Sequence, residues 1–249
     1  MIRPARSNDH AAVDALFRAV GSDGPAAARW NELTLPHTLV AERDGIVIGC
    51  VEQHPDGAIR NLIVDPEARG AGIGRALMQA AAGAMRARGL TQWRLVVDAD
   101  NVAAIRLYSR LGMYSIGHST QLRIAWATIA TIPTETIGAS PLTRADIGAL
   151  ERRFGLAQLE RHAFADGCIA NKLDGLLGVA VFAPQRADMR GVRVMRPSLT
   201  GALLASFARH AEHPHVDVTI ENNDAVCDLL EQHGADVRLR LFHMSGALV

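Results

Sequence analysis

The chain has 249 residues, of which 49% are hydrophobic and 21% are charged, so it can bury a full core and does not have the composition of a disordered protein. Its Lys and Arg residues equal its Asp and Glu residues at 26 each, which leaves no overall field to attract a polyanion. These numbers argue against nucleic acid as a partner and fit one large domain or two small ones.

The cysteines and the apolar runs predict the cellular compartment of the protein. Cys50, Cys168 and Cys227 lie in apolar runs and lack the CxxC spacing of a zinc site or a disulfide framework. They predict a reducing compartment, the cytoplasm. The N-terminus is not followed by an apolar segment of signal-peptide length, and no window approaches 18 uninterrupted apolar residues. We therefore expect neither export nor a membrane span.

The first half alternates short strands and helices. In chain order we expect a strand over 1–6, a helix over 11–20, a loop with a helical turn near Trp30 over 21–36, strands over 39–43, 46–52 and 58–64, a helix after the glycines at 70–74, a strand over 93–97 and a helix over 102–111. Asp9 and Asn101 are the expected N-caps. The pair Asp44-Gly45 predicts a hairpin turn, and Gly89 and Gly112 are expected to end helices.

A second domain follows a linker. This first half is complete by about residue 126, and the Thr-, Pro- and Gly-rich stretch Thr131–Pro141 predicts the linker. We expect a first domain over 1–130, a linker over 131–140 and a second domain over 141–249.

The second half repeats the pattern of the first. "PLTRADIGALERRF" (141–154) can be laid on "PARSNDHAAVDALF" (4–17), which matches Asp146 with Asp9. "VDVTIENNDAVCDLLEQHGA" (216–235) can be laid on "RLVVDADNVAAIRLYSRLGM" (94–113), which matches Asn223 with Asn101 and Gly234 with Gly112. A repeat this long predicts two copies of one domain and not a solenoid.

The stretch "VDPEARGAGIGRAL" (64–77) places three glycines between a strand and a helix. Free amides at such a turn, together with the helix dipole, favour an anion, and Arg69 and Arg75 suit a phosphate. The spacing fits neither a Walker loop nor a dinucleotide fingerprint. From the glycines alone, a helix entry without a ligand remains an open alternative.

Two linked motifs resemble those of a known superfamily. The pattern Arg69-x-x-Gly72-x-Gly74 resembles the acyl-coenzyme-A-binding signature of the GNAT acetyltransferases, and "DNVAAIRLYSRLGM" (100–113) resembles their next signature. The resemblance extends from residue 2 to about Leu122 and implies an α/β fold: two tandem domains, each a mixed, mostly antiparallel sheet flanked by helices, with one splayed pair of parallel strands.

The second half resembles the degenerate domain of tandem GNAT members. Where the glycine loop would lie, the chain reads "VMRPSLTGALLASF" (194–207), with one glycine and no equivalent of Arg69. Leu230 stands where Tyr108 stands in the first half. We therefore expect only the first half to bind a cofactor productively.

The resemblance implies acetyl-CoA as the cofactor and a primary amine as the acceptor, with direct attack through a tetrahedral intermediate. Strands 58–64 and 93–97 would splay to admit the pantetheine arm. The implied cofactor-binding residues are Leu62, Ile63, Val64, Arg69, Gly70, Ala71, Gly72, Ile73, Gly74, Arg75, Asn101 and Tyr108.

The resemblance also implies an acid and a base. Tyr108 is the expected general acid, because a neutral phenol can protonate a departing thiolate; its alternative role is that of a core aromatic residue. Many relatives carry a carboxylate base where this chain has Asn61, which cannot take a proton. Glu52 on the neighbouring strand is the expected substitute, directly or through water, with Asp98 as a second choice and a solvated strand residue as the alternative for Glu52.

The remaining histidines do not indicate a metal site, and an acetyltransferase and one rival function remain as hypotheses. His210, His213 and His215 lie at an expected helix end without a completing ligand set, so we expect no metal site. The acceptor, the acyl chain and the oligomeric state stay open, including pairing of the two domains within one chain. The rival hypothesis is a non-catalytic acyl-CoA-binding or regulatory protein.

Overall fold

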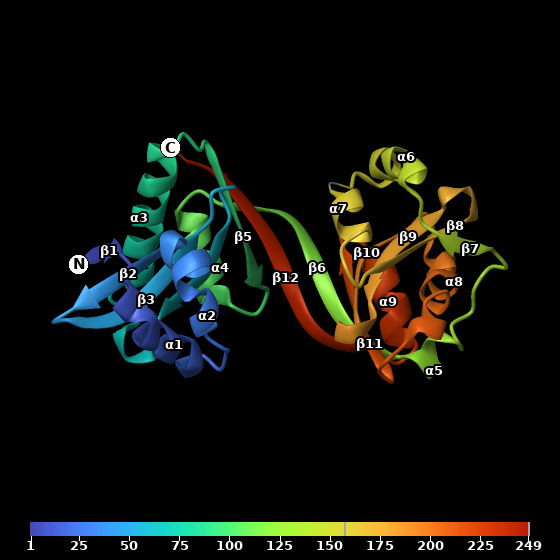
Figure 1. The fold of residues 1–249 in the computed structure, drawn as a ribbon, viewed down its shortest axis with the longest axis horizontal. Coiled ribbons are helices and arrows are strands. Elements are labelled where there is room, and N and C mark those ends of the chain that lie inside the picture. Colours follow the sequence, from blue (N-terminus) through green and yellow to red (C-terminus); the bar gives the residue numbers. More distant parts are fainter. Residues whose placement is uncertain (157, 249) are drawn as a thin grey trace. The chain divides into compact units, whose positions relative to one another are not determined.

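A computed structural model describes residues 1–156 and 158–248, which form two compact units (Figure 1). The first unit contains Met1–Ile116 and the C-terminal residues from Phe242 onward, and the second unit contains Gly117–Leu241. The expected mixed α/β architecture is confirmed, since each unit combines helices with strands of a mixed sheet.

The first unit follows the strand and helix pattern expected from the sequence. It contains β1 (Ile2–Pro4), α1 (His10–Ala19), α2 (Ala27–Arg29), β2 (Thr38–Arg43), β3 (Ile46–Gln53), β4 (Ile59–Val64), α3 (Ile73–Ala87), β5 (Gln92–Asp98) and α4 (Val102–Arg110). The first strand is shorter than expected. The segment expected to be a loop is more helical than the sequence indicated, since a π-helical turn (Trp30–Thr34) and a 3-10 turn (Leu35–His37) follow α2.

The second unit begins within a long strand. β6 (Tyr114–Ala125) and β12 (Asp236–Ala247) each have residues in both units. Between them lie α5 (Trp126–Ile129), β7 (Ala139–Pro141), α6 (Arg144–Phe154), α7 (Leu159–Ala163), β8 (Ile169–Leu173), β9 (Gly178–Ala183), β10 (Asp188–Val194), α8 (Thr200–Ala205), β11 (His215–Glu221) and α9 (Asp224–Gln232).

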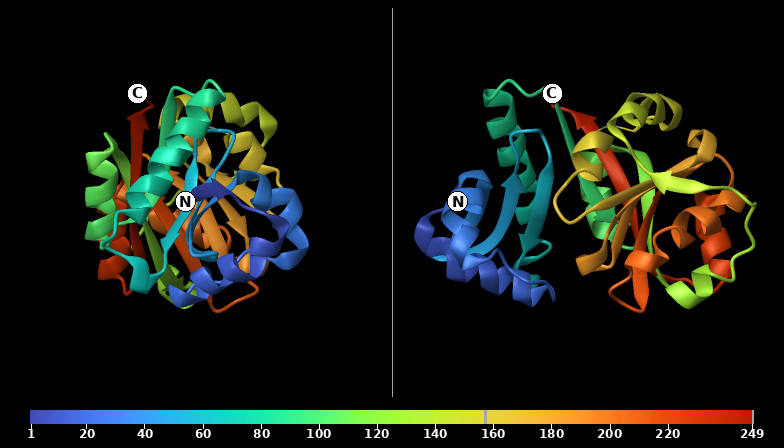
Figure 2. Two further views of the ribbon diagram at one scale, coloured as in Figure 1. Left: turned by 90° about the vertical axis from the view of Figure 1, so that its left-hand side faces the viewer. Right: turned by 45° about the vertical axis from the view of Figure 1, so that its right-hand side comes forward.

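The strands form two sheets. One has four antiparallel strands in the order β1-β2-β3-β4, and the other has eight strands in the order β5-β12-β6-β11-β10-β9-β8-β7. The turn between β2 and β3 has both Asp44 and Gly45 at positive φ, as a two-residue hairpin turn requires. The C-terminal end of β12 lies beside the start of β5 (Figure 2), where the Leu248 amide donates to the Thr91 carbonyl at 2.8 Å.

In the first unit, helices cover both faces of the four-stranded sheet. Alternate residues of β2 and β3 divide between two buried clusters, because successive side chains of a strand point to opposite faces. Val40 and Cys50 pack with Leu16 of α1, whereas Val51 packs with Leu77 of α3. The sheet therefore presents one face toward α1 and the segment after it, and the other toward α3.

In the second unit, α6 and α7 lie on one face of the sheet and α8 and α9 on the other (Figure 1). Leu150 of α6 packs with Val179 of β9, and Leu203 of α8 packs with Phe182 of the same strand. Both layers are well buried, which is what a self-sufficient domain core requires.

The internal repeat is visible in the helix starts. Asn101 and Asn223 cap α4 and α9, each accepting the amide three residues later. Asp9 and Asp146 each accept the amide of the residue three positions before them, at 2.6 and 3.0 Å. Equivalent positions of the two halves therefore have equivalent local structure.

The boundary between the two compact units does not lie in the predicted linker. The chain passes from one unit to the other at residues 116/117 and 241/242, because the long strands β6 and β12 each have residues in both units. The division of the sequence into copies over 1–130 and 141–249 stays a prediction. Within the described residues, no helix has the length and apolar character needed to cross a membrane.

Candidate functional site

The parallel strands β4 and β5 meet only at their beginnings. The Arg94 amide donates to the Gly57 carbonyl at 2.9 Å, and an isolated parallel bridge joins Ala58 to Arg94. Among the described residues no further pairing follows, and the two strands belong to different sheets. The chain beyond Ile59 therefore leaves a splayed strand pair, with Leu62, Ile63 and Val64 at the far end of β4.

An unusual backbone conformation precedes this end of β4. Asn61 has φ of +50°, a left-handed conformation that Asn adopts more readily than most residues, and the β3–β4 register shifts between Cys50 and Glu52. The extra residue bends the strand at the point where it leaves β5. The Asn61 side chain donates from Nδ2 to Glu52 Oε1 at 2.9 Å, so the bulge also holds that carboxylate.

The glycine loop connects the end of β4 to α3. Gly70 and Gly72 have φ of +79° and +77°, which only glycine adopts without cost, and a Cβ at either position would meet nothing within 4 Å. The Ala76 amide donates to the Gly72 carbonyl at 3.0 Å, so the amides of Ile73, Gly74 and Arg75 lie in the first turn, where a helix supplies no partners. Open amides at the start of a helix of 15 residues form an anion nest.

The charged and polar groups expected near this nest lie around it. Arg69 is exposed, and its Nε donates to the Val64 carbonyl at 3.2 Å, which ties the loop to the end of β4. Arg75 is exposed in the first turn of α3, beside Gly74. Asn101 Oδ1 accepts the Ala104 amide at 3.1 Å as the cap of α4, which leaves its Nδ2 as a donor.

α4 packs against the start of α3. A Cβ on Gly74 would lie 3.4 Å from the Leu107 side chain, so glycine permits this close approach. The next residue, Tyr108, is 7% exposed and belongs to the buried cluster against which Leu62, Val64 and Ile73 pack. Burial raises the pKa of the Tyr108 phenol to about 12, so the phenol stays protonated at neutral pH.

Glu52 lies on the face of the sheet covered by α1 and the segment after it. It is 9% exposed, and a buried carboxylate is costly unless it is paired. One of its oxygens accepts from Asn61, and the other lies 3.5 Å from His54 Nε2. Asp98 is held differently, since its carboxylate accepts the Asp100 amide at 2.9 Å in the turn after β5.

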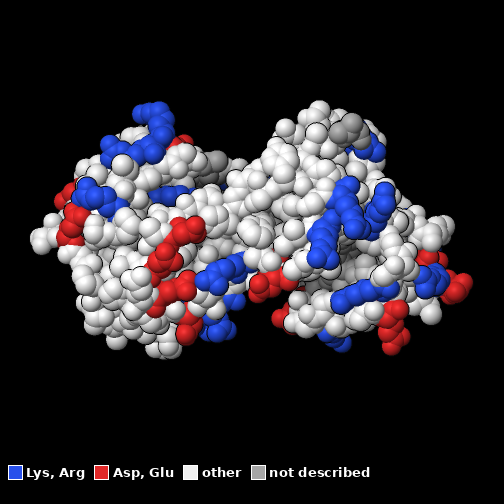
Figure 3. All heavy atoms as spheres, turned by 180° about the vertical axis from the view of Figure 1, so that it is seen from behind, with Lys and Arg blue, Asp and Glu red and all other residues white. Residues whose placement is uncertain are grey.

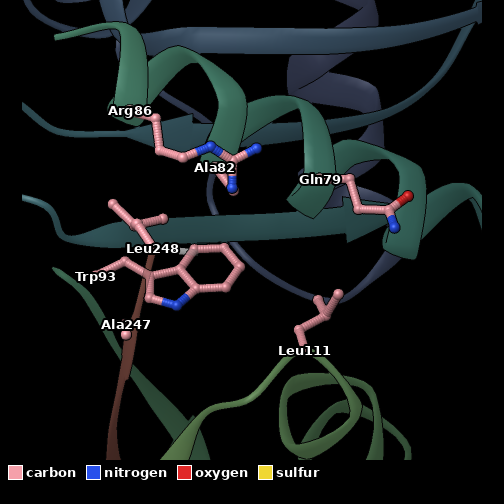
Figure 4. A pocket seen from close by; sticks show the side chains of 7 residues that line it. All are labelled: Gln79, Ala82, Arg86, Trp93, Leu111, Ala247 and Leu248. Carbon is pink, nitrogen blue, oxygen red and sulfur yellow. The ribbon is translucent and has the colours of Figure 1, made fainter. Parts of the chain in front are cut away.

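A separate hollow of about 310 Å³ lies in the first unit (Figure 4). Its walls include Gln79 and Arg86 of α3 and Trp93 of β5, together with Leu111 and Leu248. None of the residues expected to bind a cofactor lines it. The hollow is therefore distinct from the nest, although Trp93 belongs to β5.

Neither the surface charge nor the metal-ligating side chains of the described residues indicate a second site. On the face drawn in Figure 3 each unit carries both basic and acidic side chains. Within residues 1–156 and 158–248, no three His, Cys, Asp or Glu side chains are grouped to hold a metal ion. His210 and His213 lie instead beside Arg209 Nε and the Gln185 carbonyl oxygen.

Residues 11–113, which include the nest and α4, match the model of the Acetyltransferase (GNAT) family. Residues 11–113 therefore form a GNAT-family domain. Among solved structures, a GCN5-related N-acetyltransferase from Sphaerobacter thermophilus aligns with a TM-score of 0.66 and 16% identity over 100% of this chain and 95% of that one. A putative acetyltransferase from Pyrococcus horikoshii aligns with a TM-score of 0.64 and 14% identity, over 99% and 89%. These structures share the fold of the whole chain.

Curated relatives match a shorter stretch. A mycothiol acetyltransferase of Thermobispora bispora is 43% identical over 84 residues, which are 30% of this chain and 28% of that protein. A mycothiol acetyltransferase of Nocardiopsis dassonvillei is 39% identical over 99 residues, 40% of this chain and 27% of that protein. The match thus spans less than a third of either relative.

Two residues beside Glu52 were not among the residues predicted from the sequence. The structure places His54 beside Glu52, and the rings of His54 and His37 are 5.3 Å apart. Alternation along β3 could have found His54, since it is two residues after Glu52 and shares its face. His37 could not be found in this way, because it comes from the helical segment before β2.

Proposed function

We propose that the first unit binds acetyl-CoA and transfers the acetyl group to a primary amine. The observation that carries this proposal is the splayed β4–β5 pair, which ends at the open amides of the glycine nest. Peptide groups at Leu62, Ile63 and Val64 can pair with an extended arm carrying amides, and the nest can hold phosphate beside it. A free strand edge and an anion nest in sequence suit an extended ligand with a charged end.

The residues around the nest fit coenzyme A. Gly70 and Gly72 have no Cβ to block approach to the amides, and both face open space. Arg69 and Arg75 add fixed positive charge suited to phosphate oxygens. Asn101 and Tyr108 would border the ligand from α4. When bound, acetyl-CoA supplies the acetyl group as an activated thioester.

The chain's own groups can handle the protons of the reaction. A primary amine is largely protonated at neutral pH and must lose a proton before it can act as a nucleophile. Glu52 is the proposed base, since Asn61 holds one of its oxygens and leaves the other unengaged by the amide. Tyr108 is the proposed acid, since its raised pKa of about 12 keeps a proton available.

We propose the acceptor only as a primary amine. The relatives named for mycothiol match this chain over less than a third of their length, so their acceptor does not pass to it. The segment from Gly21 to His37 covers the face on which Glu52 lies and is the part of the first unit best placed to contact an acceptor.

The test follows release of free CoA thiol when the full chain is incubated with acetyl-CoA and a panel of primary amines, among them spermidine, L-cysteine and a short peptide. We expect turnover with at least one amine and a loss of about a hundredfold in Glu52→Gln, which keeps the shape of the side chain but cannot take a proton. Binding of acetyl-CoA without turnover of any amine would favour the alternative, a non-catalytic acyl-CoA-binding protein. Absence of binding would contradict both.

A further inference from the structure

Glu52 faces a histidine pair that the reaction described above does not use. His54 Nε2 lies 3.5 Å from Glu52 Oε2, too far for a direct hydrogen bond and close enough for one after a small movement. The ring of His54 lies 5.3 Å from the ring of His37, with the planes tilted by 35°. The three side chains form a row from the sheet to the 3-10 turn before β2.

Two ring nitrogens in this row are buried without partners. His54 Nε2 and His37 Nδ1 are shielded from solvent and have no hydrogen bond within the described part of the chain. Buried polar atoms are nearly always satisfied, so such a pair needs an explanation. Proton exchange with a neighbouring group is one explanation, because a nitrogen that exchanges a proton must be free to act as donor and as acceptor.

The groups around the row keep His37 neutral, so His37 can pass a proton on without retaining it. Burial lowers the pKa of His37, and the nearby His54 and Arg88 lower it further, while Glu52 partly offsets them. His37 is therefore neutral at neutral pH and can accept a proton. Asp56, in the β3–β4 turn, is engaged elsewhere, since its carboxylate accepts the Ala58 amide at 3.1 Å and pairs with Arg94 at 2.7 Å.

We propose that His54 is a positioning residue for Glu52 and the first group on a proton exit that continues to His37. This inference rests on the proposed function of Glu52 as the base. The proton taken from the amine onto Glu52 would move to His54 Nε2, while the His54 Nδ1 proton leaves toward His37 or solvent. The carboxylate is then restored, and no electrons are transferred.

One test needs no turnover. The histidine ring carbons of the full chain are labelled, and each ring is titrated by NMR in the wild type, His54→Gln and Glu52→Gln. His54→Gln should raise the pKa of His37, because a positive neighbour is removed, and Glu52→Gln should lower it, because a negative one is removed. His162→Gln, an exposed site in the second unit, is the matched control and should change nothing. A His37 titration that is the same in all four proteins would overturn the row.

A second test uses the amine that turns over. His54→Gln should lower kcat about tenfold while leaving KM for acetyl-CoA within about twofold, because proton transfer and not binding is affected. His54→Ala should be slowed similarly and recover part of its rate when imidazole is added, which a residue with only a packing role would not show. An unchanged kcat, or no response to imidazole, would contradict the proposal. If wild type turns over no amine, the proposed function fails, and the NMR titrations alone decide whether the three groups are coupled.

Discussion

The two units carry the same pair of parallel strands in two different states. In the first unit β4 and β5 are joined by one bridge, whereas in the second unit β10 and β11 pair from Asp188↔Asp217 to Val192↔Ile220. The resemblance implied a splayed pair in each domain, and this expectation differs from the structure of the second unit. Within residues 1–156 and 158–248, β4 and β5 are therefore splayed, whereas β10 and β11 remain paired.

The strand bulge alone does not open the pair. β10 shifts register between Arg190 and Arg193, and Gly191 has φ of +60°, much as β4 shifts beside Asn61. The β10–β11 pair nevertheless continues past its bulge, and an ion pair between Arg193 and Glu221 joins the two strand ends. Opening thus depends on what lies across the gap and not on the bulge itself.

The loops that follow β4 and β10 also differ, in whether their polar groups already have partners within the chain. In the second unit Pro197 begins a 3-10 turn, and Thr134 Oγ1 accepts the Ala202 amide at 3.0 Å. The Glu135 carboxylate accepts from Arg196 and from Ser198. The first unit has open amides at its nest and exposed arginines beside them. In the second unit, linker residues accept from the Ala202 amide and from Arg196.

The largest expected effect breaks the nest of the first unit. Gly72→Glu should weaken CoA binding at least about a thousandfold, or about 4 kcal/mol, because a carboxylate would lie among amides that favour an anion. Gly89→Glu is the matched control, since Gly89 has φ of +82° and is equally open. Both substitutions strain a left-handed position, and only the first adds its charge at the nest. Equal affinity in the two variants, measured by calorimetry, would refute the site.

A smaller effect compares the two helix starts. Asp9 is paired with Arg3, with side chains 8% and 11% exposed, whereas Asp146 pairs with Lys172 at 14% and 21%. Asp9→Asn should cost about 2 kcal/mol, because it removes one of the two carboxylates that pair with the largely buried Arg3 guanidinium and leaves only Glu42, and Asp146→Asn about 1 kcal/mol. Thermal and urea unfolding measure both. Equal losses would mean that the difference in burial does not matter.

The same pair predicts an acid dependence. The hydrogen bond from Arg3, the largest cause, holds the pKa of Asp9 below the usual 3.8. This contribution is present above the ordinary carboxyl pKa and is lost as pH falls through the lowered value. Wild type should therefore lose stability below about pH 4 more steeply than Asp9→Asn. Parallel curves for the two proteins would exclude the pair as the source.

The smallest effect concerns Tyr108, which Leu230 replaces in the second half. Tyr108→Phe should lower acetyl transfer about tenfold and leave CoA affinity nearly intact, since only the proton donor is removed. Because burial raises the phenol pKa to about 12, its contribution to stability is complete below the unfolded value of about 10 and lost as pH rises through 12. The variant should lack this alkaline loss. Equal loss of affinity and rate would assign Tyr108 to the core alone.

Local patterns in the sequence predicted much of this. The Asp44-Gly45 hairpin, the cap at Asn101 and the glycines that end helices are confirmed, because each depends on the conformation of a few adjacent residues. The expected cap at Asp9 is wrong, since its side chain makes no capping hydrogen bond to α1 and instead accepts the Arg6 amide. The assigned roles of Tyr108 and Glu52 stay predictions.

Other features depend on residues distant in the chain. The C-terminal residues of β12 complete the first unit, and the closure of β10 on β11 depends on strand pairing that no local pattern reveals. His37 reaches His54 only because a π-helical turn and a 3-10 turn precede β2. Periodicity could indicate which face a residue takes but not which segment would cover that face.

The most direct test of the difference between the units is the stoichiometry of CoA binding to the full chain, measured by calorimetry with wild type and Gly72→Glu. The open pair in the first unit and the closed pair in the second predict one equivalent for wild type and none for the variant. Two equivalents, or binding that survives Gly72→Glu, would contradict the assignment of the site to the first unit alone.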